Sequence, residues 1–187
     1  MDREELIRWS EPEQVLLLLD KSSEELKEML GDEFAVMKDY AQNNPHHCYN
    51  LLEHTVRTAA GMDCSGLSDE DAVQLRVAAL FHDIGKPVVA LQKNGKTVFY
   101  NHGKESRKIA EKRLPESGIE GSELKKILFY IEHHDDFISF KLKENIKEDK
   151  NGKENPFIIP VTKENVEKKI GVFAQLEKKR IYKTSKK

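Results

Sequence analysis

Apolar residues recur along this chain with the spacing of buried helix faces. The clearest stripe lies between residues 68 and 87, where apolar residues fall three or four positions apart at Val73, Val77, Leu80, Phe81 and Ile84. Ser68 is suited to cap the N-terminus of this helix, and Gly85 and Pro87 are expected to end it. The pattern predicts a long helix with one face in a core.

Similar stripes predict further helices, each bounded by Gly, Pro, Asn or a capping Ser or Thr. These helices are expected over residues 11–20, 22–30, 49–62, 103–114, 122–137 and 162–179, with Pro115 ending the fourth and with Ser122 and Thr162 capping the last two. Asn94-Gly95 lies between two β-prone runs and predicts a hairpin within residues 88–100. From residue 140 on, the segment "KENIKEDKNGKENPF" predicts a polar loop or a second small hairpin. The fold class is therefore mainly α, with one short inserted β-hairpin.

Composition is that of a globular protein of one domain. The 187 residues are 38% hydrophobic and 34% charged. We expect one domain over residues 1–175 and a basic tail over 176–187. The longest apolar run, Val15–Leu19, is too short to span a membrane. The acidic start "MDREELIRW" lacks the pattern of a signal peptide, which favours a cytoplasmic protein.

Charge is distributed unevenly along the chain. Residues 141–187 hold 14 Lys and Arg against 7 Asp and Glu, so that the preceding residues carry a net charge of −9. The basic end is a candidate for a weak RNA contact, or simply a solvated C-terminus. An acidic body argues against a duplex-binding protein.

Histidines gather on core-facing positions of several predicted helices. His82 and Asp83 follow the apolar stripe of their helix, and His54 lies on the shoulder of another. In the 122–137 helix, His134 and Asp135 fall near the apolar face and His133 falls opposite to it.

Taken alone, His82 and Asp83 are consistent with an ordinary helix C-terminus, where a histidine is favourable. Several helices that each deliver a histidine favour a metal site instead. Neutral imidazoles together with a carboxylate suit Mn, Fe, Ni or Zn, and carboxylate oxygen also suits Mg. Such an ion would offset the cost of burying Asp83.

Four segments resemble, in order, the blocks of the HD superfamily of metal-dependent phosphohydrolases. They are "NLLEHTVRTA", "AALFHDIGKP", "YNHGKESRKIAEKRL" and "YIEHHDDFI". The motif core spans residues 45–140 and looks closest to the HD region of bacterial tRNA CCA-adding and poly(A) polymerase-type nucleotidyltransferases. The resemblance implies a bundle of helices around one or two divalent ions.

The resemblance also implies roles for individual residues. The metal ligands it implies are His54, His82, Asp83, His102 and His134. Lys86 and His102 would contact the substrate and, together with Asp83, act in catalysis. Ser106 matches a serine of the family, for which we favour helix capping. His47 would have a structural role or would support the metal ligands without binding the ion itself. His46 and His133 would lie at the surface.

The family usually closes its site with an aspartate on a later helix, and this chain has no aspartate after Asp149. Either this ligand is lost, or Asp135, Asp136, Glu164 or Glu167 replaces it. The helix period favours Asp135 over Asp136. We expect a metal-dependent phosphohydrolase that acts on a nucleotide or related phosphate ester. The alternative is a catalytically weakened metal-binding module that binds RNA or a protein partner. The oligomeric state is not predicted.

Overall fold

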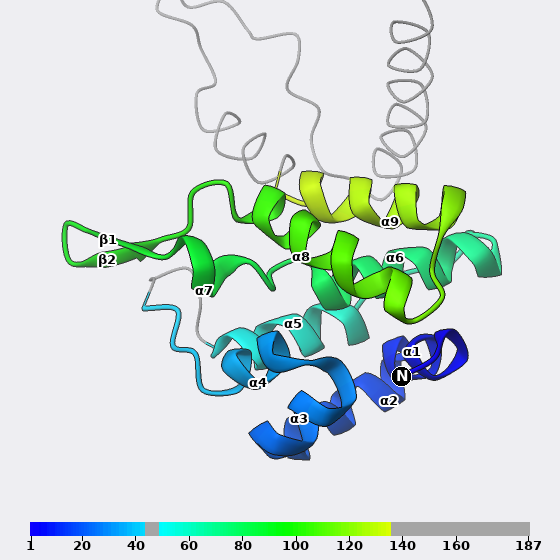
Figure 1. Ribbon diagram of the computed structural model, residues 1–187, viewed down its shortest axis with the longest axis horizontal. Helices are drawn as coiled ribbons and strands as arrows, with labels where there is room; N and C mark the ends of the chain where they lie inside the picture. Colours follow the sequence, from blue (N-terminus) through cyan, green and yellow to red (C-terminus); the bar gives the residue numbers. More distant parts are fainter. Residues whose placement is uncertain (44–48, 136–187) are drawn as a thin grey trace, which may run out of the picture. The chain divides into compact units, whose positions relative to one another are not determined.

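The structure is a computed structural model that describes residues 1–43 and 49–135. Residues 1–135 form one compact unit of helices with a small hairpin (Figure 1), which confirms the predicted fold class. The loop or hairpin predicted from residue 140 on, the helix predicted over 162–179 and the tail 176–187 lie outside the described residues. The single domain over 1–175 therefore stays a prediction.

Short helices form the N-terminal part of the unit. They are α1 (Arg3–Ser10), α2 (Pro12–Leu16), the 3-10 helix η1 (Leu17–Asp20), α3 (Ser23–Leu30) and α4 (Asp32–Lys38). The predicted helix over 11–20 is thus divided into an α-helix and a 3-10 turn. Ser22 caps α3 through a reciprocal pair of hydrogen bonds with Glu25, as its spacing favours.

Helices α5 (Leu51–Ala60) and α6 (Asp69–Phe81) pack against each other and carry the first two histidine motifs. Ser68 caps α6, because its Oγ accepts a hydrogen bond of 3.1 Å from the Asp71 N–H. Val77, Leu80, Phe81 and Ile84 of the predicted stripe are buried.

The predicted end of α6 is wrong by several residues. The helix ends at Phe81, and a turn leads into the short helix α7 (Lys86–Val89). The Gly85 N–H donates to Ser106 Oγ at 2.9 Å instead of continuing the helical ladder. Pro87 lies in the first turn of α7, where a residue without an N–H is tolerated. This turn places His82 and Asp83 at the end of a buried helix.

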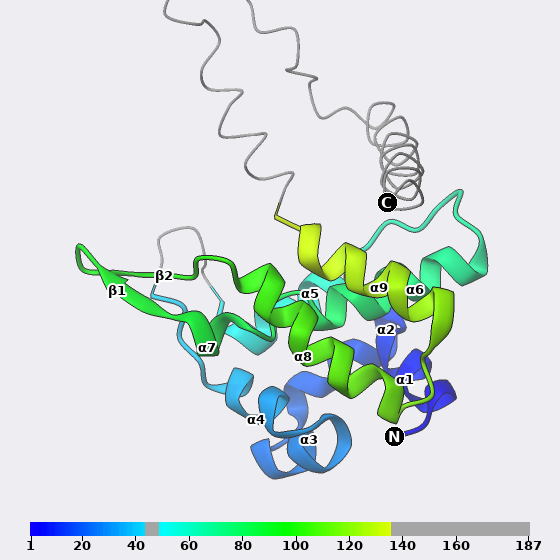
Figure 2. The same ribbon diagram turned by 45° about the horizontal axis from the view of Figure 1, so that its top comes forward.

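The hairpin consists of β1 (Leu91–Lys93) and β2 (Lys96–Val98), paired antiparallel. Asn94 and Gly95 both have positive φ angles, 52° and 73°, as the predicted two-residue turn requires. The strands are shorter than the β-prone runs, since Val88 and Val89 belong to α7. In both views the hairpin projects away from the helices (Figures 1 and 2).

Helices α8 (His102–Glu116) and α9 (Gly121–His133) lie side by side and cover α6 (Figure 2). A Cβ at Gly103 would lie 2.7 Å from the Glu132 carbonyl oxygen, so glycine permits the close approach of the two helices. Pro115 lies inside α8 and does not end it, and Glu120, not Ser122, occupies the N-cap of α9. Both boundary predictions are corrected accordingly.

The core lies between these helices. Its largest fully buried side chains are Phe34, Leu6, Leu18, Leu26, Met37, Leu51, Leu52, Leu80, Ile84, Leu114, Ile119 and Ile127. Among the described residues, no helix combines the length and apolarity that a membrane span needs.

Candidate metal centre

The carboxylate of Asp83 lies at the centre of a cluster of histidines. Its side chain is buried, with 1% of the residue exposed. Each of its two oxygens faces a different pair of imidazoles. The cluster therefore divides into two groups that share one carboxylate.

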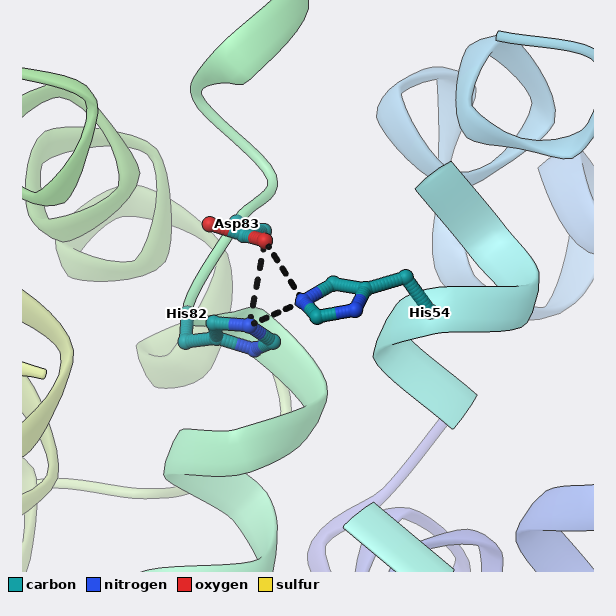
Figure 3. A group of neighbouring side chains, drawn as sticks. All are labelled: His54, His82 and Asp83. Carbon is teal, nitrogen blue, oxygen red and sulfur yellow. Dashed lines mark hydrogen bonds and ion pairs between the residues drawn. The ribbon is translucent and has the colours of Figure 1, made fainter. Parts of the chain in front are cut away.

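The first group consists of His54, His82 and Asp83. Nε2 of His54 lies 3.2 Å from Asp83 Oδ2, and Nε2 of His82 lies 3.1 Å from the same oxygen. The two Nε2 atoms are 3.4 Å apart. Figure 3 shows the ring of His54, from α5, pointing toward the two residues that follow α6.

The second group consists of Asp83, His102 and His134. Nε2 of His102 lies 3.1 Å from Asp83 Oδ1, and Nε2 of His134 lies 3.4 Å from it. The two Nε2 atoms are 3.0 Å apart. Helices α8 and α9 supply these histidines, so elements distant in sequence complete the cluster.

Backbone carbonyls fix the orientation of three of the four rings. Nδ1 of His82, His102 and His134 each lies 2.7–2.8 Å from the carbonyl oxygen three residues earlier. A carbonyl only accepts, so each Nδ1 carries the proton and donates. Nε2 of a neutral ring is then left with its lone pair directed at Asp83, which is how proteins prepare a histidine to bind a metal.

The charges at the centre stabilise the ionised carboxylates. Burial by itself would raise the pKa of Asp83, but the imidazoles around it, those of His82, His102, His134 and His54, hold that pKa well below its usual range. Burial likewise would lower the pKa of His102, yet its contacts with Asp135 and Asp83 raise that pKa to about 9. Without metal, His102 is therefore an imidazolium at neutral pH.

This donor set fits a divalent cation. In the metal-free state, one proton on His102 Nε2 faces three acceptors within 3.1 Å: Asp83 Oδ1, His134 Nε2 and Asp135 Oδ2. One proton forms a good hydrogen bond with only one of these acceptors at a time. A metal cation would attract all three of them and also the Nε2 lone pair of His102. The imidazoles of this donor set favour Fe, Ni or Zn over Mg, and its carboxylates also suit Mn.

Lys86 is buried beside the cluster, with 4% of the residue exposed, so it is not a solvated surface lysine. Its Nζ lies 2.7 Å from Asp83 Oδ2 and donates to Gln42 Oε1 at 3.0 Å. The ammonium therefore partly neutralises the carboxylate that both groups share.

Asp135 lies at the edge of the second group. Its Oδ2 is 3.0 Å from His102 Nε2, and its Oδ1 is 3.5 Å from His134 Nε2. The side chain is 45% exposed, so it can reach an ion from the solvent side. Of the residues considered as replacements for the closing aspartate, Asp136, Glu164 and Glu167 lie outside the described residues.

The remaining predicted residues have different positions. Ser106 is fully buried within α8, where it accepts from Gly85, so the helix-capping interpretation is wrong. His133 belongs to neither group, and its half-buried ring contacts Phe129 with 4.6 Å between centroids. His46 and His47 lie outside the described residues.

Gln42 and Phe99 also contact residues of the centre, and no sequence pattern predicted them. Gln42 accepts from Lys86, and the Phe99 carbonyl accepts from Nδ1 of His102. The Phe99 ring also lies 5.4 Å from Lys86 Nζ. A lone glutamine before a loop carries no signal in sequence. The carbonyl three positions before His102 is a backbone group that any residue supplies, so the identity of Phe99 carries none for this contact either.

The comparison with protein-family models agrees with this geometry. No curated protein and no solved structure matches the chain, so the nearer resemblance to CCA-adding and poly(A) polymerase-type proteins has no support. The family model of the HD domain matches residues 46–158, which is more than half of the chain and includes all five clustered residues. This chain therefore belongs to the HD domain family, a family of metal-dependent phosphohydrolases.

Proposed function

We propose that this protein hydrolyses a phosphate ester at a centre of two divalent ions that share Asp83. The observation that carries the proposal is the division of the Asp83 carboxylate, whose Oδ2 faces His54 and His82 and whose Oδ1 faces His102 and His134. Bound ions at these two groups would supply a Lewis acid for phosphoryl oxygens and a water with a lowered pKa.

The residues of the chain have distinct roles in this proposal. Asp83 bridges the two groups, and the histidine Nε2 atoms are its partners as ligands. Lys86 and His102 contact the substrate, and Lys86 offers positive charge where the transferring phosphoryl group develops negative charge. Asp135 takes the place of the closing aspartate, because its carboxylate already contacts His102 and His134.

A nucleotide or a related ester is the proposed substrate. Support for a phosphate ester comes from the family and from the cationic Lys86 at the centre. The nucleotide itself rests on the resemblance of the sequence motifs. The proposed compartment is the cytoplasm, as the N-terminal sequence favours.

The test is a screen of nucleotides and model phosphate esters with protein reconstituted separately with Mn, Fe, Ni, Zn and Mg. We expect hydrolysis with at least one metal and its loss in Asp83→Asn. Glu111→Gln, on the exposed face of α8, is the control and should retain the activity. Absence of hydrolysis from a fully metal-loaded protein would contradict the proposal.

The second candidate is a metal-stabilised module that binds RNA, which the excess of basic residues in 141–187 favours. This function predicts a strongly salt-dependent RNA affinity that disappears when residues 176–187 are deleted. A protein with metal, without hydrolysis, and with such affinity would support it.

A further inference from the structure

Gln42 is a buried polar residue outside the proposed ligand set. Only 2% of it is exposed, and it lies before the loop that precedes α5. A buried amide is costly unless both its oxygen and its nitrogen have partners. Gln42 has one partner on each side of its amide, Lys86 beside the metal centre and the backbone carbonyl of Tyr49.

The orientation of this amide follows from its neighbours. Lys86 Nζ can only donate, so the Gln42 oxygen must face it, at 3.0 Å. The Tyr49 carbonyl can only accept, so the Gln42 nitrogen must face that carbonyl, at 3.3 Å. Both ends therefore have complementary partners in one orientation.

The ammonium of Lys86 has three protons, and two have acceptors in the structure. One is directed to Asp83 Oδ2 at 2.7 Å and one to Gln42 Oε1 at 3.0 Å. Among residues 1–43 and 49–135, no oxygen or nitrogen accepts the third N–H of Lys86, and the face of the Phe99 ring lies 5.4 Å from Nζ. Two fixed hydrogen bonds determine the rotation of the ammonium and hence the direction of its remaining N–H, whereas Asp83 alone leaves it free to rotate.

We propose that Gln42 is a positioning residue that holds the Lys86 ammonium so that one N–H remains for a phosphoryl oxygen. It acts through Lys86 and contacts neither the ions nor the substrate. The role of the remaining N–H rests on the proposed function, but the placement of Lys86 by Gln42 does not.

The first test observes Lys86 directly by ¹H–¹⁵N spectroscopy of lysine ammonium groups in the full chain. A buried ammonium with two fixed acceptors exchanges its protons with water slowly, and Lys86→Met assigns the signal. We expect Gln42→Met, which conserves side-chain length, to abolish the signal or to accelerate exchange about tenfold. Gln92→Met is the matched control, since Gln92 bonds Thr97 in the hairpin and should leave the signal unchanged.

The variant Gln42→Glu separates the two contacts of the amide and remains available if Gln42→Met does not fold. It retains an oxygen acceptor for Lys86 and loses the donor to Tyr49. The proposal expects the Lys86 signal to persist in Gln42→Glu. A signal unchanged in Gln42→Met, or lost in Gln42→Glu, would overturn it.

The second test measures binding of inorganic phosphate to the Mn²⁺-loaded protein by calorimetry. We expect Gln42→Met to weaken phosphate binding about tenfold, with Mn²⁺ affinity within about twofold of the unmodified chain. In the Lys86→Met background, Gln42→Met should have no further effect. An equal loss in both backgrounds would show that Gln42 acts independently of Lys86 and would contradict the proposal.

These measurements distinguish failure of the inference from failure of the proposed function. If the Mn²⁺-loaded protein neither binds phosphate nor hydrolyses an ester, the phosphohydrolase proposal and the phosphate role of Lys86 both fall. The ammonium signal still decides whether Gln42 positions Lys86.

Discussion

Nε2 of His102 lies 3.0 Å from Nε2 of His134, although 32 residues separate the two in sequence. Both rings donate from Nδ1 to a backbone carbonyl, so two neutral imidazoles would present two lone pairs to each other. A proton or a cation between them removes this repulsion. A proton and a metal ion therefore compete for the position between the two Nε2 atoms. The predictions for pH dependence and for metal binding follow from this competition.

Metal binding should release a proton from His102. The pKa of His102 is raised to about 9, so below that pH an ion must displace the proton before it binds. We expect the affinity for Mn²⁺ to increase about tenfold per pH unit between pH 6.5 and 8.5. Calorimetry in buffers of different ionisation enthalpy measures the released proton, and the control His133→Gln should retain the same pH dependence.

The metal-free protein should lose stability as the pH rises through about 9. The pKa of His102 is higher in the folded chain, about 9 against a usual 6.5, so its contribution is fully present below pH 6.5 and is lost as the pH passes through the folded value. The loss is at most about 3 kcal/mol. Urea unfolding at pH 6.5 and pH 9.5 measures it, and His102→Gln should remove most of the difference.

The carboxylates give the opposite dependence at acidic pH. The pKa values of Asp83 and Asp135 are lowered in the folded chain by their histidine contacts. Their contribution is present above about pH 4 and is lost as the pH falls through the lowered values. Acid unfolding of the metal-free protein should therefore begin at a higher pH in Asp135→Asn.

Metal should bind through Asp83 in both groups. Asp83→Asn, or His82→Ala with Asp83→Ala, should abolish metal binding while the helical circular-dichroism spectrum persists. Asp135→Asn should weaken binding only at the second group, because Asp135 contacts His102 and His134 alone among the clustered histidines. Elemental analysis of reconstituted protein gives the stoichiometry. Unchanged metal content in Asp83→Asn would place the site elsewhere.

Added metal should stabilise the folded chain. At a free concentration one hundred times its dissociation constant, an ion bound only by the folded state adds about 2.7 kcal/mol. We expect Mn²⁺ or Zn²⁺ to raise the Tm, a chelator to reverse the increase, and Asp83→Asn to show no increase. Mg²⁺ is the comparison ion and should raise the Tm least, because four of the ligands are imidazoles.

Ser106 should stabilise the turn that carries the motif. Ser106→Ala leaves the buried Gly85 N–H without its acceptor and should cost about 1–3 kcal/mol in the free energy of unfolding. Ser122→Ala is the matched control and should change it by less than about 0.5 kcal/mol, because Ser122 is exposed and caps nothing. Equal effects of the two substitutions would contradict this role for Ser106.

Local sequence patterns predicted much of the fold. Ser68 predicted the start of α6, and Val77, Leu80 and Phe81 predicted its buried face, because capping and helical period act within a few residues. Asn94-Gly95 predicted the hairpin turn for the same reason. The boundaries at Gly85 and Ser122 were wrong, since a contact from α8 decides the first and Glu120 takes the N-cap at the second.

The sequence by itself determined which residue types are available at the centre, and the resemblance of its motifs selected His54, His82, Asp83, His102 and His134. Only the tertiary structure decided how the four histidines are divided between the two oxygens of Asp83. The packing of α5, α8 and α9 around the end of α6 assigns one histidine pair to each oxygen of Asp83 and brings Asp135 to His102. It also buries Lys86 between Asp83 and Gln42. These contacts join residues far apart in the chain, so no local pattern or helical period encodes them.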